Sequence, residues 1–165
     1  GSPMSENVYQ PPEAPVEARD EPPGSLLKGL LLGWLVHLGG KALIGGIHAA
    51  VYTGSAVLDA QGGVSDAALD AALSDLSSPL TQMGLVLGAV LAFLGGYVCA
   101  HYAREHWRTA VLIMVIAELV ADGVFFGRFE SQTFNISLAV VSAILLAAGA
   151  WWKRRPYRPS SPPRG

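Results

Sequence analysis

Residues 107–126 read WRTAVLIMVIAELVADGVFF, an apolar run that three charged side chains interrupt. A helix needs roughly 20 mostly apolar residues to cross a hydrocarbon core of about 30 Å, and this run has that length. It lacks the strict alternation of apolar and polar residues that marks a transmembrane barrel strand. In lipid only helices and closed barrels satisfy their own backbone hydrogen bonds, so the run predicts a transmembrane helix.

Three more apolar stretches extend this pattern to residues 26–58, 80–100 and 134–152. We therefore predict an all-α polytopic membrane protein, with a four-transmembrane-helix bundle over residues 26–152. The composition agrees, because only 15% of the 165 residues are charged, against about 25% in soluble domains. Residues 1–25 are expected to be a tag remnant and a disordered acidic cytoplasmic tail, and residues 153–165 a basic disordered one.

The first stretch is too long for a simple crossing, since residues 26–58 would form about 50 Å of helix. It is also too short to cross twice with a turn. Strong tilt, projection beyond the membrane, or a break at Gly39-Gly40 or Gly45-Gly46 would resolve the mismatch. We expect a long first helix whose C-terminal end projects outside.

The loop after the first helix predicts a short amphipathic helix over residues 64–76, lying on the outer surface. Its leucines share one face, and Ser65 is placed to cap its N-terminus. Ser78 is expected to cap the second span, with Pro79 at its first helical position.

The distribution of Lys and Arg predicts the orientation. With the N-terminus inside, the inner side receives most basic residues and the outer side receives only Arg128. Cytoplasmic loops carry this excess, so we expect a bacterial inner-membrane protein with both termini cytoplasmic. The inner side then carries these residues: Lys28, Arg104, Arg108, Lys153, Arg154 and Arg155.

Small residues line one side of the second span, where Gly84, Gly88 and Gly95 are expected to serve helix packing. Close backbone approach is what associates helices in lipid. Cys99 lies on the same side, and we interpret it as a small packed residue rather than a redox group. Packing within the chain and packing between protomers both remain open.

Ionisable residues inside the predicted spans are the most informative feature. His37, Lys41 and His48 fall within a wedge of about 40° on the first helix. Glu118 and Asp122 are four residues apart on the third helix and share a face. A charge at the bilayer centre costs roughly 3 kcal/mol, so these side chains should turn inward as an intramembrane polar network.

Depth predicts the partners within this network. Lys41 lies about 20 Å along its helix from the inner interface, while Glu118 and Asp122 lie about 16 and 22 Å along theirs. We therefore predict that Lys41 pairs with one or both acids. The pairing could fix helix registry or serve a proton or ion relay. We expect no metal, since about 16 Å separates His37 from His48 with Lys41 between them, and no cofactor.

No motif of a hydrolase, a metalloprotease or a phosphate-binding loop occurs in the sequence, so no catalytic residue is assigned and an enzyme is not favoured. A net charge of −2 argues against nucleic acid as a partner. His101 and His106 are expected in a solvated inner loop with ordinary titration.

Two short segments carry a resemblance. Residues 5–12, SENVYQPP, resemble the start of small uncharacterised proteobacterial inner-membrane proteins. Residues 95–98, GGYV, followed by a short basic loop, are similar to a segment of four-span bacterial proteins. The resemblance implies a four-span inner-membrane protein, and it implies no activity and no functional residue.

Two functions follow as hypotheses. The first is a non-enzymatic accessory, scaffold or protective partner of another membrane component, favoured by the small size and the small-residue stripes. The alternative is a small oligomeric proton- or cation-coupled transporter or channel that uses His37, Lys41, Glu118 and Asp122. The expected partners are the lipid bilayer and either a second copy of the chain or another membrane protein.

Overall fold

A computed structural model of the chain describes residues 23–58, 65–127 and 129–155, and every regular element in these ranges is helical. The predicted disordered tails fall largely outside the described residues, as does Arg128. The elements are α1 (Leu26–Trp34), η1 (Leu35–Gly39), α2 (Gly40–Leu58), α3 (Asp66–Ser74), α4 (Pro79–Ala103), η2 (Arg104–His106), α5 (Trp107–Val120), η3 (Ala121–Phe125) and α6 (Gln132–Arg154).

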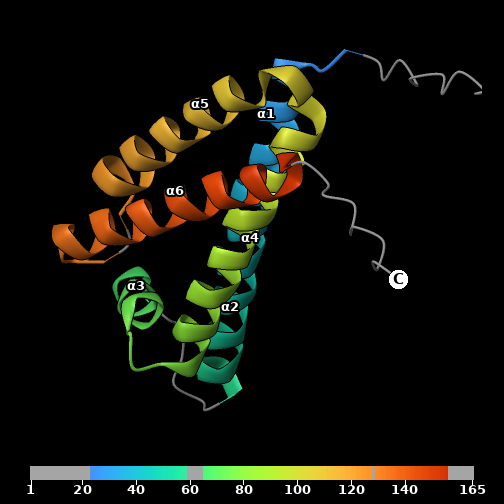
Figure 1. Ribbon diagram of the computed structural model, residues 1–165. Coiled ribbons are helices and arrows are strands. Elements are labelled where there is room, and N and C mark those ends of the chain that lie inside the picture. Colours follow the sequence, from blue (N-terminus) through green and yellow to red (C-terminus); the bar gives the residue numbers. More distant parts are fainter. Residues whose placement is uncertain (1–22, 59–64, 128, 156–165) are drawn as a thin grey trace, which may run out of the picture.

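Three helical stretches of the described chain are long and apolar enough to cross a membrane. They are Leu26–Ser55, Pro79–Phe125 and Gln132–Arg154. The second is 47 residues long, and the short 3-10 turn η2 divides it into α4 and α5. Figure 1 shows α5 leaving this turn in a direction different from that of α4.

The first helix runs without a break from α1 through η1 into α2. Ser25 caps it, since its side chain accepts a hydrogen bond from the backbone N–H of Lys28. Neither glycine pair interrupts the helix. The irregularity lies instead in the π-helical turn η1, which ends at Gly39. A π turn holds an extra residue, so it shifts the helix faces without ending the helix.

The reversal between α4 and α5 is tighter than the predicted loop. Residues 99–103 belong to α4, and Cys99, Ala100 and Ala103 are fully buried. Arg104 follows with a φ of 49°, a backbone conformation that residues other than glycine rarely adopt. Only the three residues of η2 turn the chain, because α4 stays helical for as long as it has a neighbour to pack against.

Three helix ends meet beside this reversal (Figure 1). The backbone N–H of Ser25 donates to the carbonyl of Tyr102 over 3.0 Å. The guanidinium of Arg154 donates to the carbonyl of Ala100, with Nε at 2.9 Å. The start of α1, the end of α4 and the end of α6 are thereby tied together.

The helices form two pairs that diverge from this common end. The first helix packs along α4 and α5 packs along α6, and α6 also packs extensively against α4 where the two pairs join. In Figure 1, α5 and α6 lean away from α2 and the first half of α4. The buried core lies at the junction of the pairs, and most of its members are small: Leu30, Ala92, Cys99, Ala100, Ala103, Ala110, Val111, Met114, Leu146 and Ala150. This arrangement differs from a single parallel bundle.

Glycines set the contacts at the junction. A Cβ at Gly96 would collide with the backbone of Leu146, and one at Gly149 would collide with the backbone of Phe93. Because both residues lack a side chain, the backbones of α4 and α6 touch there. A Cβ at Gly95 would lie 2.9 Å from Cβ of His37. We call this tightly packed part of the molecule the closed half.

The predicted loop contains a short helix, α3, with slightly narrower bounds than predicted. Ser65 caps it by accepting from the N–H of Ala68 over 3.2 Å. The expected cap of α4 is only partly present. Ser78 occupies the N-cap position and Pro79 begins the helix, but the Ser78 side chain makes no capping hydrogen bond.

Candidate functional site

Four predicted network residues form one chain of hydrogen bonds. Nε2 of His37 lies 2.8 Å from Oε2 of Glu118, and the ammonium of Lys41 donates to Oε1 of the same carboxylate over 2.9 Å. The ammonium also donates to Oδ2 of Asp122 over 2.6 Å. We call these four residues the charged cluster. Its dry end is His37, 1% exposed, and its open end is Asp122, whose side chain is 35% exposed.

Both π-helical turns of the molecule's described part lie at this cluster. His37 is the central residue of η1, and Asp122 is the second residue of η3. Each turn continues into or from an α-helix that carries the neighbouring member, Lys41 in α2 and Glu118 in α5. Short π-helical insertions occur frequently at functional sites. No sequence pattern marks these two turns, because the pattern of apolar residues continues through both of them.

The hydrogen bonds indicate which ring nitrogen of His37 carries the proton. Nδ1 of His37 is buried without a partner, and a buried N–H without an acceptor costs more than a bare ring nitrogen. The geometry therefore favours a neutral imidazole whose Nε2–H donates to Glu118. The cluster holds two carboxyl groups, Glu118 and Asp122, against the single ammonium of Lys41.

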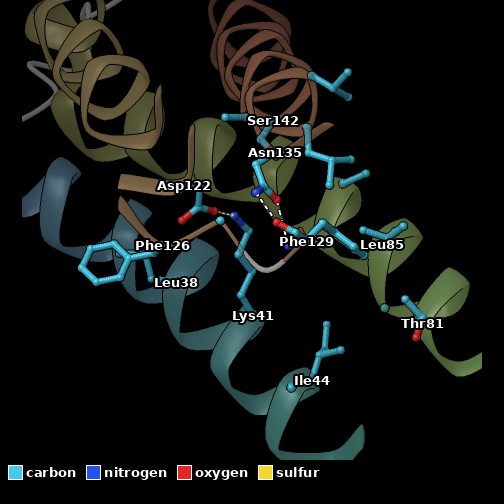
Figure 2. A pocket seen from close by; sticks show the side chains of 18 of the residues that line it. Leu38, Lys41, Ile44, Thr81, Leu85, Asp122, Phe126, Phe129, Asn135 and Ser142 are labelled. Atoms are coloured by element: carbon cyan, nitrogen blue, oxygen red, sulfur yellow. Dashed lines mark hydrogen bonds and ion pairs between the residues drawn. The ribbon is translucent and has the colours of Figure 1, made fainter. Parts of the chain in front are cut away.

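A cavity of about 340 Å³ opens beside the cluster, where the two helix pairs diverge. Lys41 and Asp122 stand in its wall and point toward each other (Figure 2). Most of the remaining lining is apolar, and it comes from the first helix, α4, the α5–α6 connection and α6: Leu38, Ile44, Leu85, Ala89, Phe126, Phe129, Leu138, Ala139 and Val141.

His48 lies in the cavity wall, apart from the charged cluster. It is 7% exposed. No described residue hydrogen-bonds to its ring. The sequence placed it in the network on helical spacing alone, but one α-helical repeat of seven residues carries it about 10 Å along the axis from Lys41. Its position makes it a wall residue of the cavity.

Three polar wall residues were missed by sequence reasoning: Thr81, Asn135 and Ser142. Asn135 is 4% exposed, and its side chain accepts from the N–H and donates to the carbonyl of Phe129, at 3.0 and 2.6 Å. It thereby shapes the connection that closes one side of the cavity, as Figure 2 shows. Thr81 is 3% exposed and lies 3.5 Å from the carbonyl of Ala72 in α3. An amide inside an apolar span was the available signal for Asn135.

The three glycines predicted to pack helices lie in two different environments. Gly95 faces Gly33 and His37 in the closed half. Gly84 and Gly88 instead line the cavity. A Cβ at Gly88 would meet nothing within 4 Å, and one at Gly84 would meet only Ile44 at 3.9 Å. Divergence of the helix pairs removes the contact that close packing at these two positions requires.

His101 and His106 lie at the reversal between α4 and α5, and they are not part of the charged cluster. His101 is exposed in the last turn of α4 and stacks edge-on against Tyr102. His106 lies 3.7 Å from the carboxylate of Glu105, with both side chains exposed. Hydrogen bonds from the backbone N–H groups of Glu105 itself and of Gly24 lower the pKa of the Glu105 carboxyl.

Comparison with known proteins adds no relative. No protein-family model matches the chain, and no curated protein or solved structure is similar to it. The charged cluster and the cavity are therefore the features that bear on function.

Proposed function

We propose that this chain is a multi-pass protein of the bacterial inner membrane, with four spans and both termini in the cytoplasm. The four spans are the first helix, α4, α5 with η3, and α6. Lys28, Lys153 and Arg154 lie near the common end of the helices, whereas α3 begins with Asp66. The orientation follows from the excess of Lys and Arg on cytoplasmic segments.

We further propose that the protein couples the movement of a proton or another cation to occupancy of its cavity. One observation carries this proposal: a chain of ionisable groups leads from the dry His37 to the wall of an open cavity. Ionisable residues within membranes are costly and commonly mark ion paths and proton relays. Glu118 links the buried ring of His37 to the ammonium of Lys41.

Transport across the molecule requires a contact in the closed half to open. The cavity lies on one side of the Gly33–Gly95 contact, where a Cβ at Gly33 would lie 3.0 Å from the carbonyl of Gly95. Movement of a cation to the other side requires this contact to open. Protonation of the cluster is suited to drive such a change, because it alters the ion pairs that hold the helix pairs together.

The test is proton flux into liposomes that contain the purified chain and a trapped pH-sensitive dye, driven by a potassium diffusion potential. We expect flux above that of empty liposomes, and Glu118→Gln and Lys41→Ala to return it to the empty level. Asp70→Asn makes the corresponding acid-to-amide change on the exposed helix α3 and should keep the wild-type rate. Flux at the empty level, or flux that neither cluster variant alters, defeats the proposal.

A second candidate function is favoured by the closed half itself. Backbone contacts between α4 and α6 at Gly96 and Gly149 seal that region, so a single chain in this conformation offers no continuous path. A non-enzymatic accessory, scaffold or protective partner needs no path. Absence of flux together with a specific co-purifying membrane protein in native-like lipid favours this function. A strictly monomeric chain without such a partner counts against it.

A further inference from the structure

We propose that the cavity binds an organic cation, a protonated amine attached to an apolar body. This ligand class deepens the proposed function and rests on it, since the cavity is the site to which cation movement is coupled. Three independent observations select the ligand: the size and lining of the cavity, the charge beside it, and the unpartnered His48.

The size and lining of the cavity fit a small amphipathic molecule. Its volume of about 340 Å³ falls at the small end of the roughly 300–1,000 Å³ typical of ligand pockets. Aliphatic and aromatic side chains from four segments form most of the wall. Two of them, Phe126 and Phe129, follow Asp122 closely in the sequence. Such walls suit an apolar body, since its burial removes apolar surface from water.

The charge beside the cavity selects a cation. Lys41 already donates to two carboxylates, so its ammonium is committed and offers little to an anion. Asp122 uses Oδ2 for that bond, and in Figure 2 its other oxygen is directed away from Lys41. Among the described residues nothing hydrogen-bonds to that oxygen. It supplies an acceptor for an ammonium, and the cluster holds two carboxyl groups against one ammonium, which favours a positive ligand.

His48 provides the second polar contact. The ring is more than nine-tenths buried, lies in the cavity wall and has no hydrogen-bond partner among the described residues. Buried polar groups normally have one, so an unpartnered ring in a cavity wall indicates a missing partner. An imidazole ring can hydrogen-bond to a molecule in the cavity, about 10 Å along α2 from Lys41.

A metal ion fits the cavity less well. Hard cations require several oxygen ligands, and borderline metals require clustered His, Cys or carboxylate side chains. No group of three such residues capable of holding a metal exists in the described ranges. Asn135 cannot help, because Phe129 occupies both ends of its amide.

The binding experiment uses calorimetric titration of the purified full chain in an uncharged maltoside detergent at neutral pH. The probes are phenethylamine, 2-phenylethanol and 3-phenylpropionate, which share a phenyl body and differ in charge. We expect saturable binding of the amine, roughly tenfold or more tighter than that of the alcohol or the acid. No saturable amine binding, or equal affinity for the three probes, overturns the proposal.

Two test variants and one control separate the effect of the cavity's volume on binding from the effect of its charge. Gly88→Leu fills the cavity from a position where an added Cβ meets nothing, and it should abolish amine binding. Gly46→Leu adds the same side chain at an exposed, equally open position outside the cavity and should bind like wild type. Asp122→Asn should keep the alcohol affinity and lose the preference for the amine. Unchanged amine binding by Gly88→Leu overturns the site even where Asp122→Asn fails to fold.

The ammonium can belong to a free amine or to an aminophospholipid, and competition distinguishes the two sources. Displacement of phenethylamine by short-chain phosphatidylethanolamine, but not by short-chain phosphatidylglycerol, assigns a lipid headgroup. Displacement by neither assigns a free amine. Amine binding without flux retains the site and removes the transport function. Flux without saturable amine binding retains transport and overturns the ligand class.

Discussion

Helix α4 carries glycines along its whole length, and they do opposite work in the two halves of the molecule. In the closed half, Gly95 and Gly96 allow other helices to reach the backbone of α4. In the other half, Gly84 and Gly88 border open space and widen the cavity. The same residue type therefore either allows close backbone contact or borders a cavity, depending on whether another helix packs against it.

The two halves are also held together by different forces. The closed half relies on small residues and direct backbone contact, which provides dispersion energy over many atoms. Where the pairs diverge, the links are the ion pairs of Lys41 with Glu118 and Asp122. Contacts of the first kind do not depend on charge, whereas ion pairs respond to protonation and ligand. This difference places the groups that sense a proton or a ligand in the half that holds the cavity.

The largest expected effect tests the contrast between the glycines. Gly96→Ala places a Cβ against the backbone of Leu146, which cannot rotate away, and overpacking of this kind costs about 3 kcal/mol of unfolding free energy. Gly88→Ala meets nothing and should stabilise α4 by about 0.4–1 kcal/mol, because alanine loses less chain entropy in a helix. Unfolding by SDS titration in mixed micelles measures both changes. Equal effects at the two positions would erase the distinction between the halves.

A smaller effect is expected from the ion pairs. Lys41→Met leaves two carboxylates without their counter-charge and should cost roughly 2 kcal/mol, less than a fully buried pair because Lys41 keeps partial exposure. Replacing Lys41, Glu118 and Asp122 together by apolar residues should cost less than the single change, since no unpaired charge remains. The same SDS titration compares the two variants. Equal losses would show that the cluster contributes through side-chain shape rather than charge.

The smallest effect concerns the common end of the helices. The carboxylate of Glu105 accepts hydrogen bonds from Gly24, and its pKa is lowered in the folded chain. A lowered pKa means that the ionised form stabilises the fold above its unfolded value of about 4.3 and loses that contribution as pH falls through the folded pKa.

Glu105→Gln should therefore lower the midpoint of thermal unfolding slightly at neutral pH and leave it unchanged in acid. Circular dichroism melts of both proteins at the two pH values measure this difference. Exposure of the Glu105 side chain to solvent keeps the effect small. A gap between the two proteins that persists in acid would assign the effect to something other than the carboxylate.

The positions of the helices along the chain could be predicted from the sequence more fully than their packing. Span lengths, the cap at Ser65 and the start of α4 at Pro79 depend on local chemistry, and the structure has them close to the predicted positions. The predicted inner loop was too long, because α4 continues through Ala103 where neighbours bury it. Residue depth along straight helices was enough to name Lys41 and the two acids as neighbours, as the structure places them.

Other members of the site depended on contacts that no local pattern encodes. His48 left the network, Asn135 and Thr81 joined the cavity wall, and Gly84 and Gly88 changed from packing to lining residues. Each change follows from the divergence of the two helix pairs. That divergence depends on which glycine meets which backbone, as at Gly96 and Leu146.

The sequence by itself determined that the chain is helical and apolar, and that a few ionisable groups must find partners inside it, because burial of a lone charge is too costly. Only the tertiary structure decided that these groups form a single chain ending at a cavity. The physical reason is that hydropathy acts along one helix, whereas a cavity exists only where two helices fail to meet.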